Sequence, residues 1–216
     1  MDLGSGKSRL SSGAVRFIGA ALVLAGGIAA AGQAGEARTS EFIIGGAAGA
    51  PVKIEVFSDF QCPACRNFYL ETIKPILANY CSQNKVCVVY RDFPLEMHLY
   101  ARAAARYSIA AQRLGRERWL RISEALYTYQ DQWSQDGNLE AVLSKVLDPT
   151  EVARLRKLAA DPATEAALEK ELMLGQSRAV NSTPTFFITT ESGRLQRVNG
   201  PVPYPVIKDY LDRLIK

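Results

Sequence analysis

The stretch VKIEVFSDFQCPAC, residues 52–65, decides the fold of this chain. Its first part, residues 52–58, is rich in β-branched and aromatic side chains and predicts a central β-strand. A helical pattern then runs from Arg66 to about Tyr80, with a bend or break expected near Pro75. Two cysteines separated by two residues therefore lie at a strand-to-helix junction, which is typical of a redox site.

The position of Cys62 at a helix start favours a thiolate, because free backbone N–H groups and the helix dipole stabilise negative charge there. Cysteines so placed have pKa values of roughly 3.5–7.5, against about 8.5 for a free thiol. Pro63 fits the first helical turn, where a missing N–H costs little. Cys65, one turn further on, can close a disulfide with Cys62, so these residues predict thiol–disulfide exchange.

The whole chain has 216 residues, an ordinary globular composition and a net charge of +4, which is too small an excess to indicate nucleic-acid binding. The arginines between residues 102 and 121 predict a solvated helical face or, alternatively, a steering patch for an acidic partner.

Residues 1–37 have the pattern of a signal peptide or an N-terminal anchor. Basic residues at positions 7, 9 and 16 precede an apolar, Gly/Ala-rich run, and cleavage could follow Ala31, Ala34 or Ala37. Either outcome predicts a periplasmic or otherwise exported protein, in a compartment where disulfides persist.

The rest of the chain predicts a βαβ unit, a helical block, and a final hairpin and helix. A strand at 86–90 completes a right-handed βαβ unit with parallel strands. A helical block follows, in which Asp148-Pro149 and Asp161-Pro162 are helix starts and residues 130–137 are expected to form a polar loop. The chain ends with a predicted hairpin and helix, at 185–189, 195–198 and 205–215.

Three segments carry a resemblance to a known family. FSDFQCPAC at 57–65, NSTPTFF at 181–187 and YRDFPL at 90–95, which His98 follows, resemble the DsbA-like branch of the thioredoxin superfamily. The resemblance implies an α/β thioredoxin fold, a central mixed sheet flanked by helices, with an inserted helical domain. Residues 38–97 and 181–216 would form the thioredoxin-like domain, and residues 98–180 the insertion.

The same resemblance implies that the Thr183–Pro184 bond is cis and faces the cysteines. The Thr183 backbone would then pair with a substrate peptide beside Cys62, as a short added strand. On the residues alone, a trans proline at the start of an edge strand fits as well.

Glu55 occupies the place of a buried acid in related enzymes, allowing one extra residue before Cys62. There it could take the proton of Cys65 during attack on a mixed disulfide. The alternative is an ordinary strand-end charge paired with Lys53. Asp59 is closer in sequence to the cysteines, but it could equally cap a turn.

Cys81 and Cys87 lie at a helix end and the next strand start. A structural disulfide, unpaired buried thiols and a second redox pair all fit them, whereas zinc or haem spacing does not. His98 is expected to cap or pack against the first inserted helix, or to tune the active-site thiolate. Trp119 and Trp133 are expected in the core of the insertion, or alternatively in a substrate groove.

The resulting hypothesis is an exported thiol–disulfide oxidoreductase in which Cys62 attacks, or is attacked in, a substrate disulfide, giving a mixed disulfide that Cys65 resolves. The segment between the predicted signal peptide and the strand at 52–58 is too short for the separate dimerisation domain of disulfide isomerases, which favours a monomeric disulfide-donating oxidase. Thr183 before the proline resembles isomerases and reductases instead, and a non-catalytic peptide-binding chaperone module with a static disulfide is a third alternative. Expected partners are cysteine-containing proteins or peptides and a membrane redox partner, with no cofactor, metal or nucleic acid.

Overall fold

The computed structural model describes residues 41–215, which belong to one compact unit. The predicted signal peptide or anchor at 1–37 lies outside the described residues. Within the described part of the chain, no helix combines the length and the apolar character needed to cross a bilayer.

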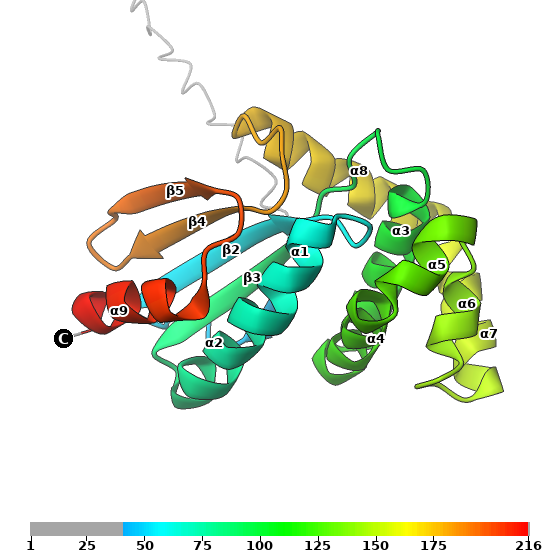
Figure 1. Cartoon of the computed structure of the whole chain (residues 1–216), viewed down its shortest axis with the longest axis horizontal. Coiled ribbons are helices and arrows are strands. Elements are labelled where there is room, and N and C mark those ends of the chain that lie inside the picture. The colour runs from blue at the N-terminus through cyan, green and yellow to red at the C-terminus, as the bar shows by residue number, and fades with distance from the viewer. Residues whose placement is uncertain (1–40, 216) are drawn as a thin grey trace, which may run out of the picture. The chain divides into compact units, whose positions relative to one another are not determined.

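A five-stranded mixed sheet lies at the centre of the fold (Figure 1), in the order β1-β3-β2-β4-β5. Strands β2 and β3 are parallel, and every other neighbouring pair is antiparallel. The predicted βαβ unit, edge strand and C-terminal hairpin are therefore confirmed. The strands are β1 (Ile43–Gly45), β2 (Val52–Ser58), β3 (Val86–Asp92), β4 (Thr185–Thr190) and β5 (Leu195–Asn199).

The two faces of the sheet bury different groups, because side chains alternate along a strand. Ile54 and Val56 belong to the main core, which also contains side chains of α1 (Pro63–Phe68), α2 (Lys74–Asn79) and α9 (Tyr204–Leu214). Phe57 points the other way and packs with Phe93 and Phe187 near the end of α8 (Pro162–Ser177). Helices thus cover both faces of the sheet, as in the predicted thioredoxin fold.

The helix after the cysteines is interrupted, as the sequence predicts. A π-helical turn at Tyr69–Ile73 separates α1 from α2, and Pro75 lies in the first turn of α2. Proline cannot donate the backbone hydrogen bond of a continuous α-helix, and its ring crowds the preceding turn. A wider turn just before Pro75 accommodates both effects.

The insertion between β3 and β4 is entirely helical. Asp148 and Asp161 each accept a backbone hydrogen bond at a helix start, which confirms both predicted N-caps. Trp119 and Trp133 are fully buried, so both are core residues and not part of a substrate groove. Its helices are α3 (Ala101–Gln112), α4 (Arg116–Thr128), α5 (Gln130–Asp136), α6 (Leu139–Leu143), α7 (Pro149–Ala159) and α8.

The polar loop predicted at 130–137 is wrong, because most of this segment forms helix α5. Its indole at Trp133 is buried and donates a hydrogen bond to the Leu126 carbonyl at 2.7 Å. Gly137 then ends the helix in a left-handed conformation with φ of 75°. Burial of one tryptophan therefore orders a segment whose other side chains are mostly polar.

Candidate active site

Cys62 is the N-cap residue of α1, with an extended backbone (φ −76°, ψ 121°), and Pro63 begins the helix. Its Sγ lies 3.4 Å from the Thr183 carbonyl oxygen, to which the sulfur donates when it is protonated. Cys62 keeps 8% of its surface exposed, whereas Cys65 is fully buried. The first cysteine is therefore the one that a visiting sulfur can reach.

The pKa of the Cys62 thiol is lowered from 9.0 to about 6. The largest cause is a hydrogen bond from the Cys65 thiol. Partial burial opposes it, and the backbone N–H groups of Cys65 and Ala64 at the helix start add to the lowering. At neutral pH the Cys62 sulfur is thus mainly a thiolate, as its position in the sequence predicts.

Cys65 is held in the opposite state. Burial raises the pKa of its thiol well above the usual value, and the charge on Cys62 raises it further. A hydrogen bond from the Ser58 side chain and the backbone N–H of Asp59, at 3.5 Å from Cys65 Sγ, work against this rise. The pair thus has one ionised and one protonated sulfur, the arrangement that a two-step exchange needs.

The loop before β4 faces the dithiol, and its Thr183–Pro184 bond is cis, as the resemblance implies. Both ends of this loop are tied to β5 and the segment after it. Arg197 donates to the Arg178 and Ala179 carbonyls at 3.1 and 2.8 Å, and the Gly200 N–H donates to the Pro184 carbonyl at 2.8 Å.

The segment before Cys62 is braced by Asp59, which is buried. One carboxylate oxygen accepts the Gln61 N–H at 2.7 Å, which confirms the turn-capping alternative. The other accepts the Leu95 N–H at 2.9 Å and lies 2.7 Å from His98 Nδ1. His98 therefore precedes α3 and contacts this brace, not the thiolate itself.

Two glutamines complete the brace, and sequence analysis missed both. The Gln130 amide, on α5, donates to the carbonyls of Phe60 and Cys62 at 2.6 and 3.1 Å. Gln61 accepts the Tyr100 N–H at 2.7 Å and donates to the Ser134 carbonyl at 3.1 Å. Their contacts join segments far apart in the chain, so no local pattern could have indicated them.

Glu55 requires a correction, because the structure does not place it beside Cys65. Its carboxylate bonds Arg91 at 2.8 Å and also contacts Arg178. These two guanidinium groups outweigh burial and lower the pKa of Glu55. Glu55 and Ser58 are three positions apart on β2, so their side chains lie on opposite faces of the sheet. The predicted proton relay from Cys65 to Glu55 has no geometric support, and neither has its alternative pairing with Lys53, which bonds Glu41.

Cys81 and Cys87 are both free thiols in the structure. Cys81, at the start of η2 (Cys81–Gln83), belongs to the core cluster that contains Val86 and Val88. Cys87 alternates with those valines on β3, so its side chain points to the other face of the sheet. The disulfide between them stays a prediction. Thiol titration of the denatured, air-oxidised protein tests it, and two titratable thiols would contradict it.

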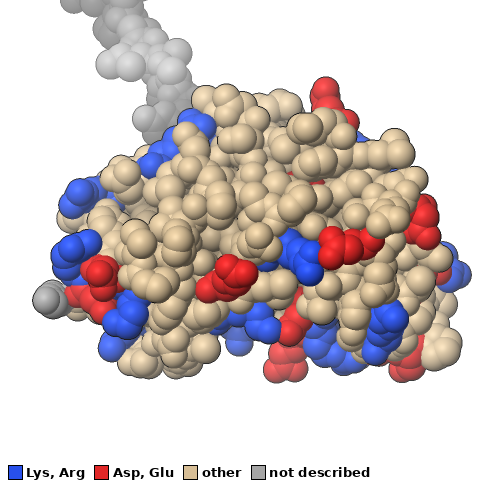
Figure 2. Space-filling model, viewed as in Figure 1, with Lys and Arg blue, Asp and Glu red and all other residues tan. Residues whose placement is uncertain are grey.

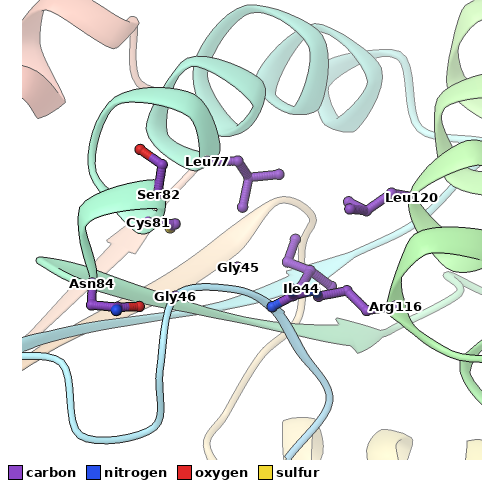
Figure 3. Close-up of a pocket in the computed structure, with 9 residues that line it drawn as sticks. All are labelled: Ile44, Gly45, Gly46, Leu77, Cys81, Ser82, Asn84, Arg116 and Leu120. Atoms are coloured by element: carbon purple, nitrogen blue, oxygen red, sulfur yellow. The ribbon is translucent and has the colours of Figure 1, made fainter.

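A cavity of about 360 Å³ lies at the C-terminal end of β1, and Figure 3 shows the residues that line it. Neither Cys62 nor Cys65 lines it, and burial raises the pKa of the Cys81 thiol there to about 12. The cavity therefore offers no reactive sulfur at neutral pH. Its lining residues are Ile44, Gly45, Gly46, Leu77, Cys81, Ser82, Asn84, Arg116 and Leu120. Among residues 41–215, no cluster of His, Cys, Asp and Glu could hold a metal ion.

The sheet, the Cys-X-X-Cys pair at a helix start and the cis-proline loop facing it define the class: a protein of thioredoxin fold. A family model described as thioredoxin matches residues 38–198, and the chain belongs to this family.

The chain is also similar to named proteins and to solved structures. The chain is 23% identical over 144 residues to the probable disulfide bond formation protein D of Bacillus cereus, covering 64% of this chain and 66% of that protein. It is 29% identical over 153 residues to the Na(+)/H(+) antiporter NhaA 3 of Salinispora tropica, covering 70% of this chain but only 21% of the antiporter.

The crystal structure of Wolbachia pipientis alpha-DsbA1 superposes with a TM-score of 0.68 at 18% identity, covering 82% of this chain and 91% of that one. The superposition agrees with the thioredoxin fold of this chain, to which the family model also assigns it.

Proposed function

We propose that this chain exchanges disulfides with cysteine-containing proteins through Cys62 and Cys65, and that it acts as a disulfide-donating oxidase. The observation that carries the proposal is the unequal dithiol: Cys62 has a pKa of about 6 and some exposure, while Cys65 is buried and protonated. The name of the Bacillus relative, which refers to disulfide bond formation, supports the donating direction.

The chemistry follows in two steps. A substrate thiolate attacks Sγ of Cys62 in the oxidised protein, breaks the Cys62–Cys65 disulfide and forms a mixed disulfide. A second substrate thiolate then attacks its own partner sulfur and releases Cys62 as a thiolate. Two electrons pass from the substrate dithiol to the protein, and the low pKa of Cys62 makes it a good leaving group.

The surface beside the dithiol fits an unfolded polypeptide. Met97 and Leu99 expose 81% and 77% of their surface, and their loop is bonded to the Cys62 segment through His98 and Tyr100. Figure 2, drawn in the view of Figure 1, shows charged side chains mostly along the lower half of the molecule and a largely uncharged area above them. Apolar segments around a substrate cysteine can contact such a surface, while the Thr183 backbone pairs with the peptide.

The likeness to DsbA proteins supports an exported, periplasmic location and a membrane redox partner that re-oxidises the dithiol. The redox partner and the substrates would both react with the Cys62 sulfur. A monomer is therefore sufficient for both reactions.

A trapping experiment tests the exchange itself. Cys65→Ala should accumulate protein substrates on Cys62 as mixed disulfides that reducing agent releases, and Cys62→Ala, the matched control, should accumulate none. If Cys65→Ala traps no protein in cells that express it from its own signal, the chain is a non-catalytic peptide-binding module instead.

Direction is decided by a separate measurement. Equilibration of the Cys62–Cys65 pair with glutathione buffers gives its reduction potential, and an oxidase requires a value well above about −200 mV. A strongly reducing potential would assign the chain to the isomerases or reductases, which Thr183 before the proline also resembles.

A further inference from the structure

A chain of buried hydroxyl groups lies behind Cys65. Ser58 Oγ is 2.8 Å from the Tyr127 hydroxyl, which is 2.7 Å from the Tyr90 hydroxyl. All three residues are buried, and they come from β2, α4 and β3. Ser58 directly precedes Asp59, whose backbone N–H lies 3.5 Å from Cys65 Sγ, and the Ser58 side chain lowers the pKa of the Cys65 thiol, so the chain of hydroxyl groups ends next to the resolving sulfur.

The resolving step needs such a group. Cys65 must lose its proton to attack the mixed disulfide at Cys62, although its surroundings are fully buried and disfavour a charge. Glu55, the acid that the sequence suggested for this task, bonds Arg91 on the other face of the sheet. The groups that do act on Cys65 are the Asp59 N–H, which lies 3.5 Å from its Sγ, and the Ser58 side chain, which lowers the pKa of its thiol.

We propose that Ser58 is a catalytic residue which donates a hydrogen bond to the Cys65 thiolate during resolution, and that Tyr127 and Tyr90 are positioning residues that orient its proton. A thiolate can only accept, so Ser58 must donate to it, Tyr127 to Ser58 and Tyr90 to Tyr127. Three aligned hydroxyl dipoles then point at the sulfur, and each strengthens the next. This proposal rests on the proposed disulfide exchange.

The step balances without another reactant. In the proposed oxidase, Cys65 resolves the mixed disulfide that forms when the disulfide of the redox partner re-oxidises the reduced protein. The bond between Cys62 Sγ and the redox partner's sulfur breaks, and the bond between Cys62 Sγ and Cys65 Sγ forms. The Cys65 proton leaves to solvent and is recovered by the departing thiolate of the redox partner, while the three hydroxyl groups keep their protons. The redox partner's sulfur is reduced, and the dithiol is oxidised by the same two electrons.

The arrangement gives the helical insertion a part in the chemistry. Tyr127 lies on α4, whereas both cysteines and Ser58 lie in the thioredoxin-like part of the chain. The ring of Tyr127 is fixed against Phe60 and Tyr69, at centroid distances of 4.6 and 4.8 Å. The insertion thereby holds one hydroxyl in place behind the resolving cysteine.

Stopped-flow mixing of the reduced protein with excess aromatic disulfide (dithionitrobenzoate) tests the proposal, because its two phases separate the two sulfurs. The first equivalent of coloured thiol is released when Cys62 attacks, and the second when Cys65 resolves. Loss of a hydrogen bond to a charged group should slow the second phase relative to the first about tenfold in Ser58→Ala and about threefold in Tyr127→Phe. Both variants should also shift the pH profile of the second phase upward.

Tyr69→Phe is the matched control, since it removes a hydroxyl from the neighbouring buried ring, outside the chain of hydroxyl groups, and should change neither rate. A folded Ser58→Ala protein with an unchanged ratio and pH profile would overturn the proposal, even if its thermal stability falls. If Ser58→Ala does not fold, the same result with Tyr127→Phe overturns it. Failure of the proposed function looks different: the unmodified protein itself would lack a fast first phase.

Discussion

The pH dependence of Cys62 reactivity is the most direct consequence of the site. Its thiol has a pKa of about 6, and the largest cause is the hydrogen bond from Cys65. Replacing Cys65 by Ala removes that donor but keeps the backbone N–H groups at the helix start. A hydrogen bond to a charged group contributes about 1.5–3 kcal/mol, so Cys65→Ala should raise the pKa of Cys62 by about one to two units.

The same pKa sets how far the thiolate favours the reduced protein. At pH 7 a thiol with a pKa of 9.0 would still be protonated, so only the one pH unit above the Cys62 pKa of about 6 contributes to the stabilisation of the reduced protein at pH 7. The gain at pH 7 is about 1.4 kcal/mol, or about 30 mV of reduction potential. Because the folded-state pKa is depressed, this gain grows as pH rises from 6 to 9 and vanishes as pH falls below 6.

The assay is the rate of alkylation by iodoacetamide from pH 4 to pH 9, with the modified cysteine identified by peptide mapping. The rate at Cys62 should rise with a midpoint near pH 6 in the unmodified protein and at higher pH in Cys65→Ala. Cys81 and Cys87 should stay unlabelled over most of this range, because burial raises both of their pKa values. A midpoint above pH 8 in the unmodified protein, or no shift in Cys65→Ala, would refute this account of the site.

Three further predictions concern other parts of the molecule. Burial raises the pKa of Glu171 to about 7. Protonated Glu171 therefore stabilises the fold fully below pH 4.5, and this stabilisation is lost as the pH rises to 7. Urea titrations should show that Glu171→Gln removes about 3 kcal/mol of the pH dependence of the free energy of unfolding over this range. Gly137→Ala should lower the free energy of unfolding by about 2 kcal/mol or more, because a Cβ there would lie 2.6 Å from the Tyr100 ring. Gly193→Ala is the control, since Gly193 has a similar φ but open space around it, and it should cost about 1 kcal/mol. Equal losses in the two variants would contradict the steric argument. Replacing Met97 and Leu99 together by Ser should slow oxidation of a reduced, unfolded protein about tenfold while leaving the reaction with glutathione unchanged, and an equal effect on both substrates would rule out a peptide-binding role for this surface.

Local patterns predicted the parts of the fold that depend on local chemistry. Asp-Pro pairs mark the starts of α7 and α8, and Pro75 marks the break after the cysteines. The strand-to-helix junction at Cys62 likewise follows from residues 52–65 alone. These features depend on backbone donors and on alternation, which neighbouring residues determine.

The parts that failed depend on which elements meet in space. Alternation along the strand already puts Glu55 and Ser58 on opposite faces of β2. It does not determine which face α1 covers, and that face provides the surroundings of Cys65. Helix α5 forms because Trp133 and Gln130 find partners 7 to 70 residues away. The contact between Ser58 and Tyr127 likewise spans 69 residues, beyond any local pattern.

The two ties that hold the proline loop to β5 have a consequence for how substrates arrive. Arg197 donates a hydrogen bond to the Ala179 carbonyl, and the Gly200 N–H donates one to the Pro184 carbonyl, so the residues between them are held at both ends. We therefore expect the proposed polypeptide substrates to meet this loop in a fixed conformation. The flexibility needed to lay an extended segment beside Thr183 and Cys62 would then have to come from the substrate.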